Sequence, residues 1–323
     1  MHVYRSLEAV PAGFGPSALT IGNFDGVHVG HRRILRRLKE LAREHGWKTA
    51  VLTFDPHPTR VVAPKSAPKL LTTPERRAEL MAEEGIDQVL ILPFTHEIAR
   101  LSPKEFVTQL LVDRLGVRAV LVGENFRFGH RQSGDTRVLA ELGKQYGFET
   151  EIVPVLSCRG LVASSSQVRE LIQSGRVSMA ARLLLRPYAV EGEVVHGHGI
   201  GSRQTVPTLN LHTAAETLPA GGVYLTRTQD LESERRWNSI TNIGYRPTFG
   251  ESDQLSIETF LLDPLEGETP HRIRLEFLRR VRDERKFESS EALRAQILRD
   301  VHTAQTYFRR VKDWVVPVAG AVR

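Results

Sequence analysis

In the first 185 residues, short apolar runs alternate with amphipathic segments, and this alternation constrains the fold more than any other feature. Four runs have the length of buried strands: "ALTIGNF", "KTAVLTFD", "QVLILPF" and "RAVLVG". The segments between them carry helix signals, such as Gly46 as a stop and a capping-box spacing from Ser102 to Glu105. A further helix over about 135–146 and a strand near "TEIVPV" follow. This order predicts a largely parallel sheet with helices on both faces.

In the second half the pattern changes to strands separated by glycine, proline and polar turns. In "HRIRLEFLRR", Ile273, Leu275 and Phe277 alternate with polar residues, as in a half-buried strand. A segment with one apolar stripe, "SSEALRAQILRDVHTAQTYFRR", predicts a closing helix. We therefore expect an α/β plus mostly β chain. Its predicted parts are a Rossmann-like domain over residues 1–185 and a small antiparallel barrel with a terminal helix over residues 186–323.

Composition excludes several classes of protein. The chain has 323 residues and one cysteine, Cys158, so an intramolecular disulfide and a four-cysteine zinc site are both ruled out. No segment approaches the ~20 apolar residues that a membrane-spanning helix needs. The first residues lack the charged start and apolar run of a secretion signal. We expect a cytoplasmic protein with no membrane partner. The net charge of +6 permits phosphorylated small molecules as well as nucleic acid as partners.

The stretch "GNFDGVHVGHRRIL" holds the strongest candidate site. His28 and His31 could be metal ligands, phosphate-binding groups, or ordinary residues of a helix start. Zinc helices usually pair histidines at i and i+4 beside a glutamate, whereas here the spacing is three and the local carboxylate is Asp25. Gly22 lets a ligand approach the backbone closely, and Gly26 and Gly30 permit a tight loop with exposed N–H groups. The N-terminus of the following helix attracts anions to the same place. Because ligands bind at the carboxyl ends of parallel strands, the stretch predicts a nucleotide triphosphate site.

This stretch resembles a known family. "HVGH" is similar to the His-x-Gly-His signature of nucleotidylyltransferases, and "GNFDGVHVGH" resembles its form in bacterial bifunctional riboflavin kinase/FAD synthetases. "TFDPHP" resembles the family's second strand and its exit, and "VGENFRFGHRQSGD" at 122–135 resembles its flavin-site segment. "ASSSQVRELI" is similar to the Ser-Ser-Thr-x-x-Arg motif, with Ser166 in place of the usual threonine. The resemblance covers roughly residues 15–310 and implies a nucleotidylyltransferase domain followed by a riboflavin kinase barrel.

The resemblance implies roles in the N-terminal domain. The phosphate of FMN would attack the α-phosphate of ATP, giving FAD and pyrophosphate without a covalent enzyme intermediate. His28 and His31 would stabilise charge on the triphosphate, and Arg169 would hold the leaving pyrophosphate. Without the resemblance, the serines of "SSS" would be a capping loop and Phe128 a core residue. The residues implied in ligand binding are Gly22, Asn23, Phe24, Gly30, Asn125, Phe128, Ser164, Ser165 and Ser166.

In the second half, "TVPTLNL" predicts a metal site. Thr208 and Asn210 lie two apart on an extended segment, so their side chains face the same way. Their oxygens suit Mg²⁺, although an ordinary turn is the alternative. The segment resembles the Pro-Thr-Ala-Asn motif of riboflavin kinases, and Gly197 and Gly201 belong to a stretch similar to the family's phosphate-side glycine loop. Glu258 occupies the position of the catalytic base, which would accept the proton of the ribityl 5′-hydroxyl.

The chain departs from the family pattern at three places. Leu209 stands where alanine is usual, and Thr205 and Val206 stand where the family often has glycine and an aromatic or aliphatic residue. "DPLEGETPHRIR" matches poorly a segment that is more aromatic and acidic in the family. We expect the first departure to be harmless. The second and third lie in parts expected to form flaps over nucleotide and flavin, so we expect them to change the affinity of the kinase, while the metal ligands and the base remain.

The predicted function is therefore bifunctional flavin synthesis. With ATP and Mg²⁺, riboflavin would be phosphorylated to FMN, and FMN would then be converted to FAD. Partners would be the small molecules ATP, riboflavin and FMN, with no nucleic acid, and the chain would be a monomer or a weak homo-oligomer. The opening motif alone also allows an adenylyltransferase acting on phosphopantetheine or nicotinate mononucleotide. The basic charge and the small barrel also allow an RNA-binding protein. Such a protein would need aromatic residues interleaved with Lys and Arg on one face of the barrel, and this part of the sequence has few aromatic residues that look exposed.

Overall fold

The chain divides by its contacts into two compact units, Met1–Val168 and Arg169–Arg323, which are described separately. This division falls before the predicted domain boundary at 185/186, because helix α8 (Val177–Leu184) packs against strands of the second unit. The position at which the two catalytic modules separate stays a prediction. The computed structural model describes residues 1–158, 160–195, 208–248 and 251–312.

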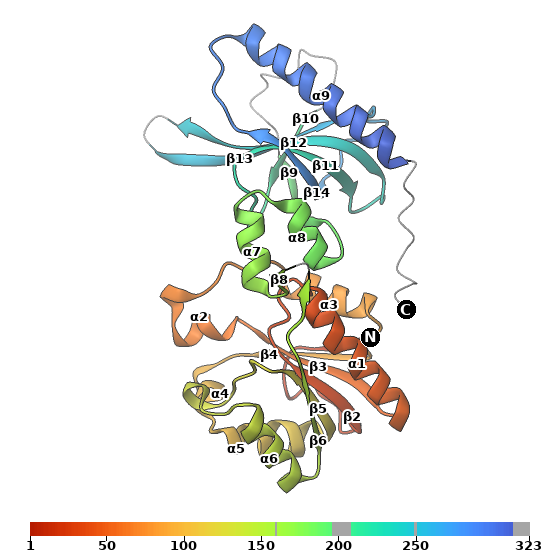
Figure 1. Cartoon of the computed structure of the whole chain (residues 1–323), viewed down its shortest axis with the longest axis vertical. Coiled ribbons are helices and arrows are strands. Elements are labelled where there is room, and N and C mark those ends of the chain that lie inside the picture. Colours follow the sequence, from red (N-terminus) through yellow and green to blue (C-terminus); the bar gives the residue numbers. More distant parts are fainter. Residues whose placement is uncertain (159, 196–207, 249–250, 313–323) are drawn as a thin grey trace. The chain divides into compact units, whose positions relative to one another are not determined.

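The N-terminal unit is built on a six-stranded parallel sheet with the order β1-β4-β3-β2-β5-β6 (Figure 1). The chain builds β3 and β4 on one side of β2 and then returns to build β5 and β6 on the other. The strand order therefore reverses between β2 and β5, where open α/β sheets bind ligands. The strands are β1 (His2–Tyr4), β2 (Ser17–Ile21), β3 (Lys48–Asp55), β4 (Gln88–Pro93), β5 (Val117–Gly123) and β6 (Glu149–Val153).

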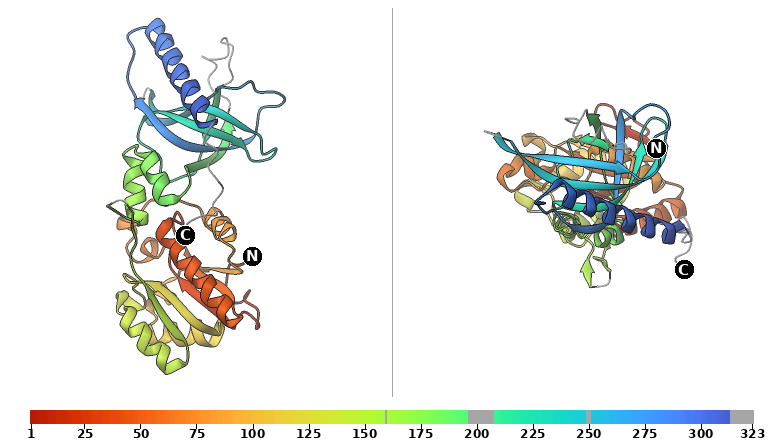
Figure 2. Two further views of the ribbon diagram at one scale, coloured as in Figure 1. Left: turned by 45° about the vertical axis from the view of Figure 1, so that its right-hand side comes forward. Right: turned by 90° about the horizontal axis from the view of Figure 1, so that it is seen from above.

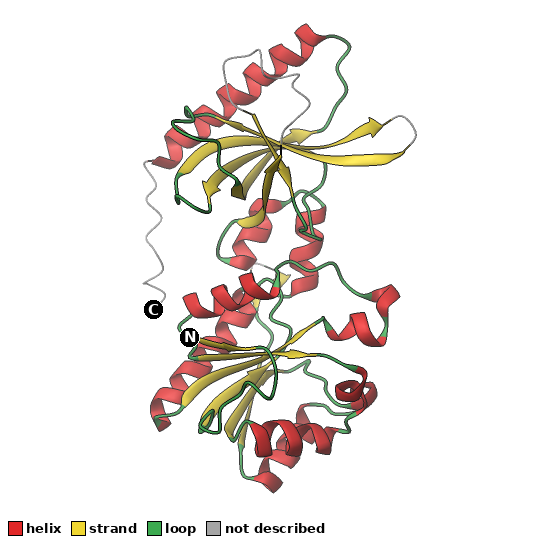
Figure 3. Cartoon of the chain, turned by 180° about the vertical axis from the view of Figure 1, so that it is seen from behind, coloured by secondary structure: helices red, strands yellow, loops and turns green. Residues whose placement is uncertain are grey.

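Helices cover both faces of this sheet, as the sequence predicts (Figure 3). On one face α1 and α3 bury Leu38 and Leu80, and on the other η2 and α6 bury Leu110 and Leu139. A small pair of strands, β7 and β8, precedes α7. The elements are α1 (Val29–His45), α2 (Pro58–Val62), η1 (Pro64–Ser66), α3 (Pro74–Glu83), α4 (His96–Arg100), α5 (Pro103–Glu105), the π-helix η2 (Phe106–Arg114), η3 (His130–Gln132), α6 (Thr136–Tyr146), β7 (Ser157–Cys158), β8 (Leu161–Val162) and α7 (Ser165–Gln173).

Helix boundaries in this unit follow the signals in the sequence. Gly46 ends α1 in a left-handed conformation with φ 69°, which glycine adopts without steric cost. Ser102 and Glu105 form the predicted capping box at the start of α5. Strand β1 was not predicted, because three residues at a sheet edge carry no periodic signal.

The C-terminal unit contains a closed antiparallel barrel with the strand order β10-β13-β12-β11-β14-β9. Helix α9 lies along its outer wall, where Ala304 and Phe308 pack against Val223, Leu225 and Ile240 (Figure 2). The predicted barrel and terminal helix are therefore confirmed. The elements are β9 (Tyr188–Val195), β10 (Thr208–His212), β11 (Gly222–Asp230), β12 (Arg236–Thr248), β13 (Glu251–Leu261), β14 (Arg272–Asp283) and α9 (Ser290–Lys312).

The barrel interior contains a network of hydroxyl groups. Thr226 bonds to Ser239 and Thr241 at 2.8 Å each, and Thr241 bonds to Thr259 at 2.9 Å. All four are fully buried, and their mutual bonds offset the loss of water. Because side chains alternate along a strand, the residues between them face outward.

Candidate active sites

The loop between β2 and α1 carries the two predicted histidines and has a strained backbone. Phe24 and Val27 have φ angles of 49° and 39°, a region that residues other than glycine rarely adopt. The Phe24 side chain is 1% exposed, and its ring centroid lies 4.8 Å from that of His31. The side chain of Phe24 therefore supports His31 from the core, and only the backbone of Phe24 is left for the ligand contact that the resemblance implies.

A buried carboxylate holds this loop in place. Asp25 is 2% exposed and accepts hydrogen bonds from the backbone N–H groups of Leu71 and Thr72 at 3.0 Å. The Thr72 hydroxyl donates to Asp25 at 3.1 Å and accepts from the Gly26 N–H at 3.1 Å. Strained backbone persists only where its surroundings determine it, and these bonds supply that constraint.

His28 is the N-cap of α1 and stacks on His31, with ring centroids 3.7 Å apart. The Nδ1 atom of His28 accepts the N–H groups of Gly30 at 3.2 Å and of His31 at 3.4 Å. A ring nitrogen that accepts carries no hydrogen, so a neutral His28 carries its hydrogen on Nε2. Capping the helix therefore leaves Nε2–H as the donor that His28 offers to a ligand.

His31 is partly buried between His28 and Phe24. Its Nδ1 atom is enclosed, and no hydrogen-bond partner for it occurs among the described residues. Burial, reinforced by repulsion from His28 and Arg77, holds the pKa of His31 well below its ordinary value. The ring is neutral near pH 7, so it meets a phosphate as a hydrogen-bond donor rather than as a cation.

A buried arginine, which the sequence analysis did not single out, braces the ends of β2 and β3. Arg77 on α3 is 2% exposed. Its Nη1 donates to the backbone oxygen of Asn23 at 2.8 Å, the hydroxyl of Thr53 at 3.1 Å and the backbone oxygen of Phe54 at 3.3 Å. Burial lowers the pKa of Arg77, yet arginine stays protonated in proteins. Arg77 lies among charged residues in the sequence of α3, so the sequence predicts an exposed side chain and not a buried one.

The serine segment meets the histidine loop, as the family resemblance implies. The Ser165 hydroxyl donates to the backbone oxygen of Asp25 at 2.8 Å. A Cβ atom at Gly30 would lie 3.2 Å from the backbone oxygen of Ala163, so glycine permits this close approach. Segments about 140 residues apart in sequence are thereby joined at one site.

The three serines have different environments. The Ser164 hydroxyl accepts the Gln167 N–H at 3.2 Å and so caps α7, as the alternative interpretation of the segment held. Ser165 is engaged by the histidine loop, and the side chain of Ser166 is exposed. Arg169 lies in α7, one turn after Ser165. Of the three serines, Ser166 is therefore the one best suited to reach an anion.

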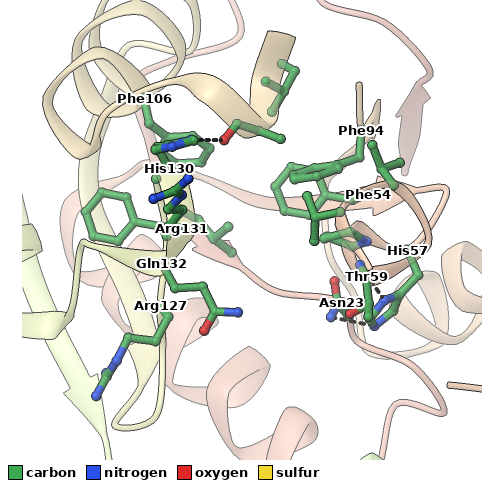
Figure 4. A pocket seen from close by; sticks show the side chains of 18 of the residues that line it. Asn23, Phe54, His57, Thr59, Phe94, Phe106, Arg127, His130, Arg131 and Gln132 are labelled. Atoms are coloured by element: carbon green, nitrogen blue, oxygen red, sulfur yellow. Dashed lines mark hydrogen bonds between the residues drawn. The ribbon is translucent and has the colours of Figure 1, made fainter. Parts of the chain in front are cut away.

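A cavity of about 730 Å³ opens at the carboxyl end of β2 (Figure 4). Its volume lies within the roughly 300–1,000 Å³ of small-molecule sites. Four predicted ligand-binding residues line it: Gly22, Asn23, Asn125 and Phe128. The phenylalanine and arginine residues that line it are Phe54, Phe94, Phe106, Phe126, Phe128, Arg100, Arg127 and Arg131. Aromatic walls and guanidinium groups suit a planar ring system that bears a phosphate.

The segment 122–135 forms one side of this cavity. Phe128 and Gly134 exchange backbone hydrogen bonds at 3.0 and 2.9 Å, which closes the loop between them. A Cβ atom on Gly134 would lie 2.7 Å from the Phe128 ring, so this position requires glycine. Arg131 and Gln132 both have positive φ angles, 51° and 59°. This strain is typical of a loop shaped for binding.

The second candidate site lies on the outer face of the barrel. Asn210 on β10 stands directly opposite Glu258 on β13, and Glu258 stands opposite Asn242 on β12. Leu209 faces the interior and is 3% exposed, whereas Thr208 is exposed. Thr208, Asn210 and Glu258 therefore share one face, and the departure from alanine at Leu209 fills the core instead of the site.

Further carboxyl and hydroxyl groups border this face. Glu258 accepts a hydrogen bond from the Ser256 hydroxyl at 3.0 Å. Glu284, which the sequence analysis did not single out, places its carboxylate beside Gly244 on β12. The acidic-basic segment "RVRDERKF" was the signal that could have found it. The predicted Gly197 and Gly201 lie outside the described residues, as do the departures at 205 and 206.

Neither a metal-binding cluster nor a membrane-spanning helix occurs among the described residues. In these parts of the chain no group of three or more His, Cys, Asp or Glu side chains could hold a metal ion. No helix there has the length and apolar character needed to cross a membrane.

Known proteins match both halves of the chain. The FAD synthetase family model matches residues 12–167, and the riboflavin kinase family model matches residues 184–308. A bifunctional riboflavin kinase/FMN adenylyltransferase of Pseudomonas fluorescens is 37% identical over 94% of this chain and 97% of its own length. The protein of the same name from Escherichia coli K12 is 36% identical over 91% of this chain and 93% of its own.

A solved structure also matches. A crystal structure from Streptococcus pneumoniae, described as a macrolide-efflux protein, has a TM-score of 0.84 and 25% identity, covering 94% of this chain and 98% of that one. The efflux description concerns that protein, whereas the family models and the curated relatives agree on flavin enzymes. This chain belongs to the family of bifunctional riboflavin kinase/FMN adenylyltransferases.

Proposed function

We propose that the cavity beside the histidine loop is the site of FMN adenylylation, and that the outer face of the barrel around Glu258 is the site of riboflavin phosphorylation. The chain carries both activities of its family, riboflavin kinase and FMN adenylyltransferase. The observation that carries the assignment is the cavity at the point where the strand order reverses, lined by Gly22 and Asn23 of the loop that also carries His28. The family match favours flavin over phosphopantetheine or nicotinate mononucleotide as the substrate.

In the adenylyl transfer, an oxygen of the FMN phosphate attacks the α-phosphorus of ATP, and pyrophosphate leaves. His28 offers Nε2–H, and the neutral His31 offers a second donor, to the charge that develops on the phosphate oxygens. Because the loop is locked by Asp25, these donors are oriented before the substrate binds. Ser166 and Arg169 bind the departing pyrophosphate. The aromatic residues of the cavity contact the isoalloxazine ring.

In the kinase reaction, Glu258 accepts the proton of the ribityl 5′-hydroxyl while that oxygen attacks the γ-phosphate of ATP. Thr208 and Asn210 present a hydroxyl and an amide oxygen on the same face as Glu258, and such hard oxygen donors fit Mg²⁺. A bound Mg²⁺ would neutralise charge on the phosphates of ATP. We propose a cytoplasmic location and a monomeric or weakly oligomeric state.

The assignment of the first site is tested with His31→Ala. Removing one donor from a preorganised site costs about a hundredfold or more in rate. We expect the conversion of FMN to FAD to fall by this factor and the phosphorylation of riboflavin to stay unchanged. Both products are measured by chromatography after incubation with ATP and Mg²⁺. Equal loss of both activities in a folded variant would contradict separate sites.

The assignment of the second site is tested with Glu258→Ala. Without a base, FMN formation from riboflavin should be abolished, while added FMN should still be converted to FAD. Normal phosphorylation of riboflavin by this variant would show that Glu258 is not the base.

A further inference from the structure

His57 is held at both of its ring nitrogens. It is the N-cap of α2, and its Nδ1 accepts the Thr59 N–H at 3.2 Å. This nitrogen therefore carries no hydrogen, and the neutral ring has its hydrogen on Nε2. The Nδ2 atom of the Asn23 amide lies 2.9 Å from Nε2. Two donors cannot share one hydrogen bond, so we assign the amide with its nitrogen and oxygen exchanged, and Oδ1 then accepts from Nε2–H.

This pairing fixes the direction of the Asn23 amide. With Oδ1 bonded to His57, the two hydrogens of the NH₂ group are turned away from His57. Asn23 and His57 both line the cavity, on the wall that faces Arg127 and Gln132 (Figure 4). The NH₂ group is thus a donor at the cavity wall. A protonated His57 would still donate from Nε2, so the orientation does not depend on the charge of the ring.

The backbone of Asn23 is fixed as well. Its carbonyl oxygen accepts from Arg77 at 2.8 Å and from the Thr53 hydroxyl at 3.2 Å. Asn23 follows Gly22 at the carboxyl end of β2, where the phosphate groups of both substrates must meet for adenylyl transfer. Because both the backbone carbonyl and the side-chain amide of Asn23 are held, the side chain loses little conformational entropy when it binds a substrate.

We propose that His57 is a positioning residue that aims the Asn23 NH₂ group at a phosphate oxygen of a bound substrate. The phosphate belongs either to FMN or to ATP, and kinetics separate the two. The inference rests on the adenylyl-transfer site proposed above.

The first test is Asn23→Asp, which has nearly the same shape. The carboxylate still accepts from His57 but replaces the NH₂ donor by a negative oxygen. A hydrogen bond to a charged group is worth roughly ten- to a hundredfold in affinity or rate, and we expect FAD formation from FMN to fall by at least that much. A rise in the KM for FMN alone assigns the contact to the flavin phosphate, and a rise in the KM for ATP alone assigns it to the nucleotide.

The second test is a matched pair at His57. Asparagine places an acceptor near the position of Nδ1 and preserves the cap of α2, but it is too short to reach Asn23. Glutamine places an amide N–H near the position of Nε2 and can still donate to Asn23. His57→Gln should therefore retain several times more FAD formation than His57→Asn, and adding His57→Asn to Asn23→Asp should lower the rate little further.

Riboflavin phosphorylation by the same preparations is the control for folding. Normal FAD formation by Asn23→Asp, or lower activity of His57→Gln than of His57→Asn, would overturn the positioning role. If His31→Ala also left FAD formation unchanged, the failure would lie with the proposed site. If His31→Ala lost activity as expected, only the inference about His57 and Asn23 would fail.

Discussion

Removing the carboxylate of Asp25 should destabilise the loop between β2 and α1, which carries His28, without disturbing the barrel. In Asp25→Ala, the buried N–H groups of Leu71 and Thr72 lose their acceptor. Each unpaired buried donor costs about 1–3 kcal/mol, so the free energy needed to open the loop should fall by about 2–6 kcal/mol. Asp25→Asn keeps one oxygen but turns an NH₂ group toward a backbone donor, and it removes the charge. We expect it to cost about 1–3 kcal/mol, from the difference between charged and neutral hydrogen bonds.

Hydrogen exchange measures this effect locally. The amide hydrogens of Leu71 and Thr72 point at Asp25, so they report the bond that is removed. Since about 1.4 kcal/mol corresponds to a factor of ten, Asp25→Ala should speed their exchange by roughly 30-fold or more, and Asp25→Asn by less. FAD formation should fall in the same order, because the loop positions both histidines.

The matched control is Asp113→Ala, which removes an exposed carboxylate from η2 in the same unit. It should change neither the exchange of the two amides nor the rate of FAD formation. Riboflavin phosphorylation should be normal in all three variants. If Asp25→Ala left the exchange of Leu71 and Thr72 unchanged, the carboxylate would not be the group that holds the loop, and the reasoning would be refuted.

Three further perturbations follow from the N-terminal unit. Because the native pKa of His31 lies well below the ordinary 6.5, the unfolded state binds the extra proton below pH 6.5. Stability should then fall by up to about 1.4 kcal/mol per pH unit from pH 6.5 down to the native pKa, and His31→Gln should flatten this part of the urea midpoint plotted against pH. Arg77→Met removes one donor from each of three acceptors and should lower both FAD formation and the urea midpoint, whereas Arg77→Lys should restore part of each. Gly134→Ala drives a methyl group into the Phe128 ring and should raise the KM for FMN. Its control is Gly13→Ala, where a Cβ would contact nothing within 4 Å.

The sequence predicted those features of the fold that depend on interactions between residues close together in the chain. Apolar runs and helix caps depend on residues within a few positions, so the parallel sheet and the ends of α1 and α5 could be read directly. The spacing of Thr208 and Asn210 placed their side chains on one face for the same reason. The position of Glu258 opposite Asn210 could not be read this way, because it depends on the register between two strands. For that residue the resemblance to a family supplied what periodicity could not.

The contacts that shape the adenylylation site escaped prediction because each joins distant segments. Arg77 reaches Asn23 across 54 positions, and Thr72 reaches Asp25 across 47. A hydrophilic residue on a helix or loop reads as solvent-exposed until the fold brings an acceptor to it. The family motif "GNFD" contains Asn23 and Asp25, but it does not indicate which groups these two residues bind.

The strain in the loop explains why such long-range contacts are needed. Positive φ angles at Phe24 and Val27 oppose the local preferences of both residues, so the loop does not favour this conformation by itself. The energy that holds it comes from partners on other segments, namely Thr72, Arg77 and Ser165. The arrangement of the histidines therefore forms only when α3 and the serine segment have docked on the sheet. A substitution at one of these partners acts on catalysis through the backbone of the loop, even though the partner itself lies beyond the reach of the phosphate.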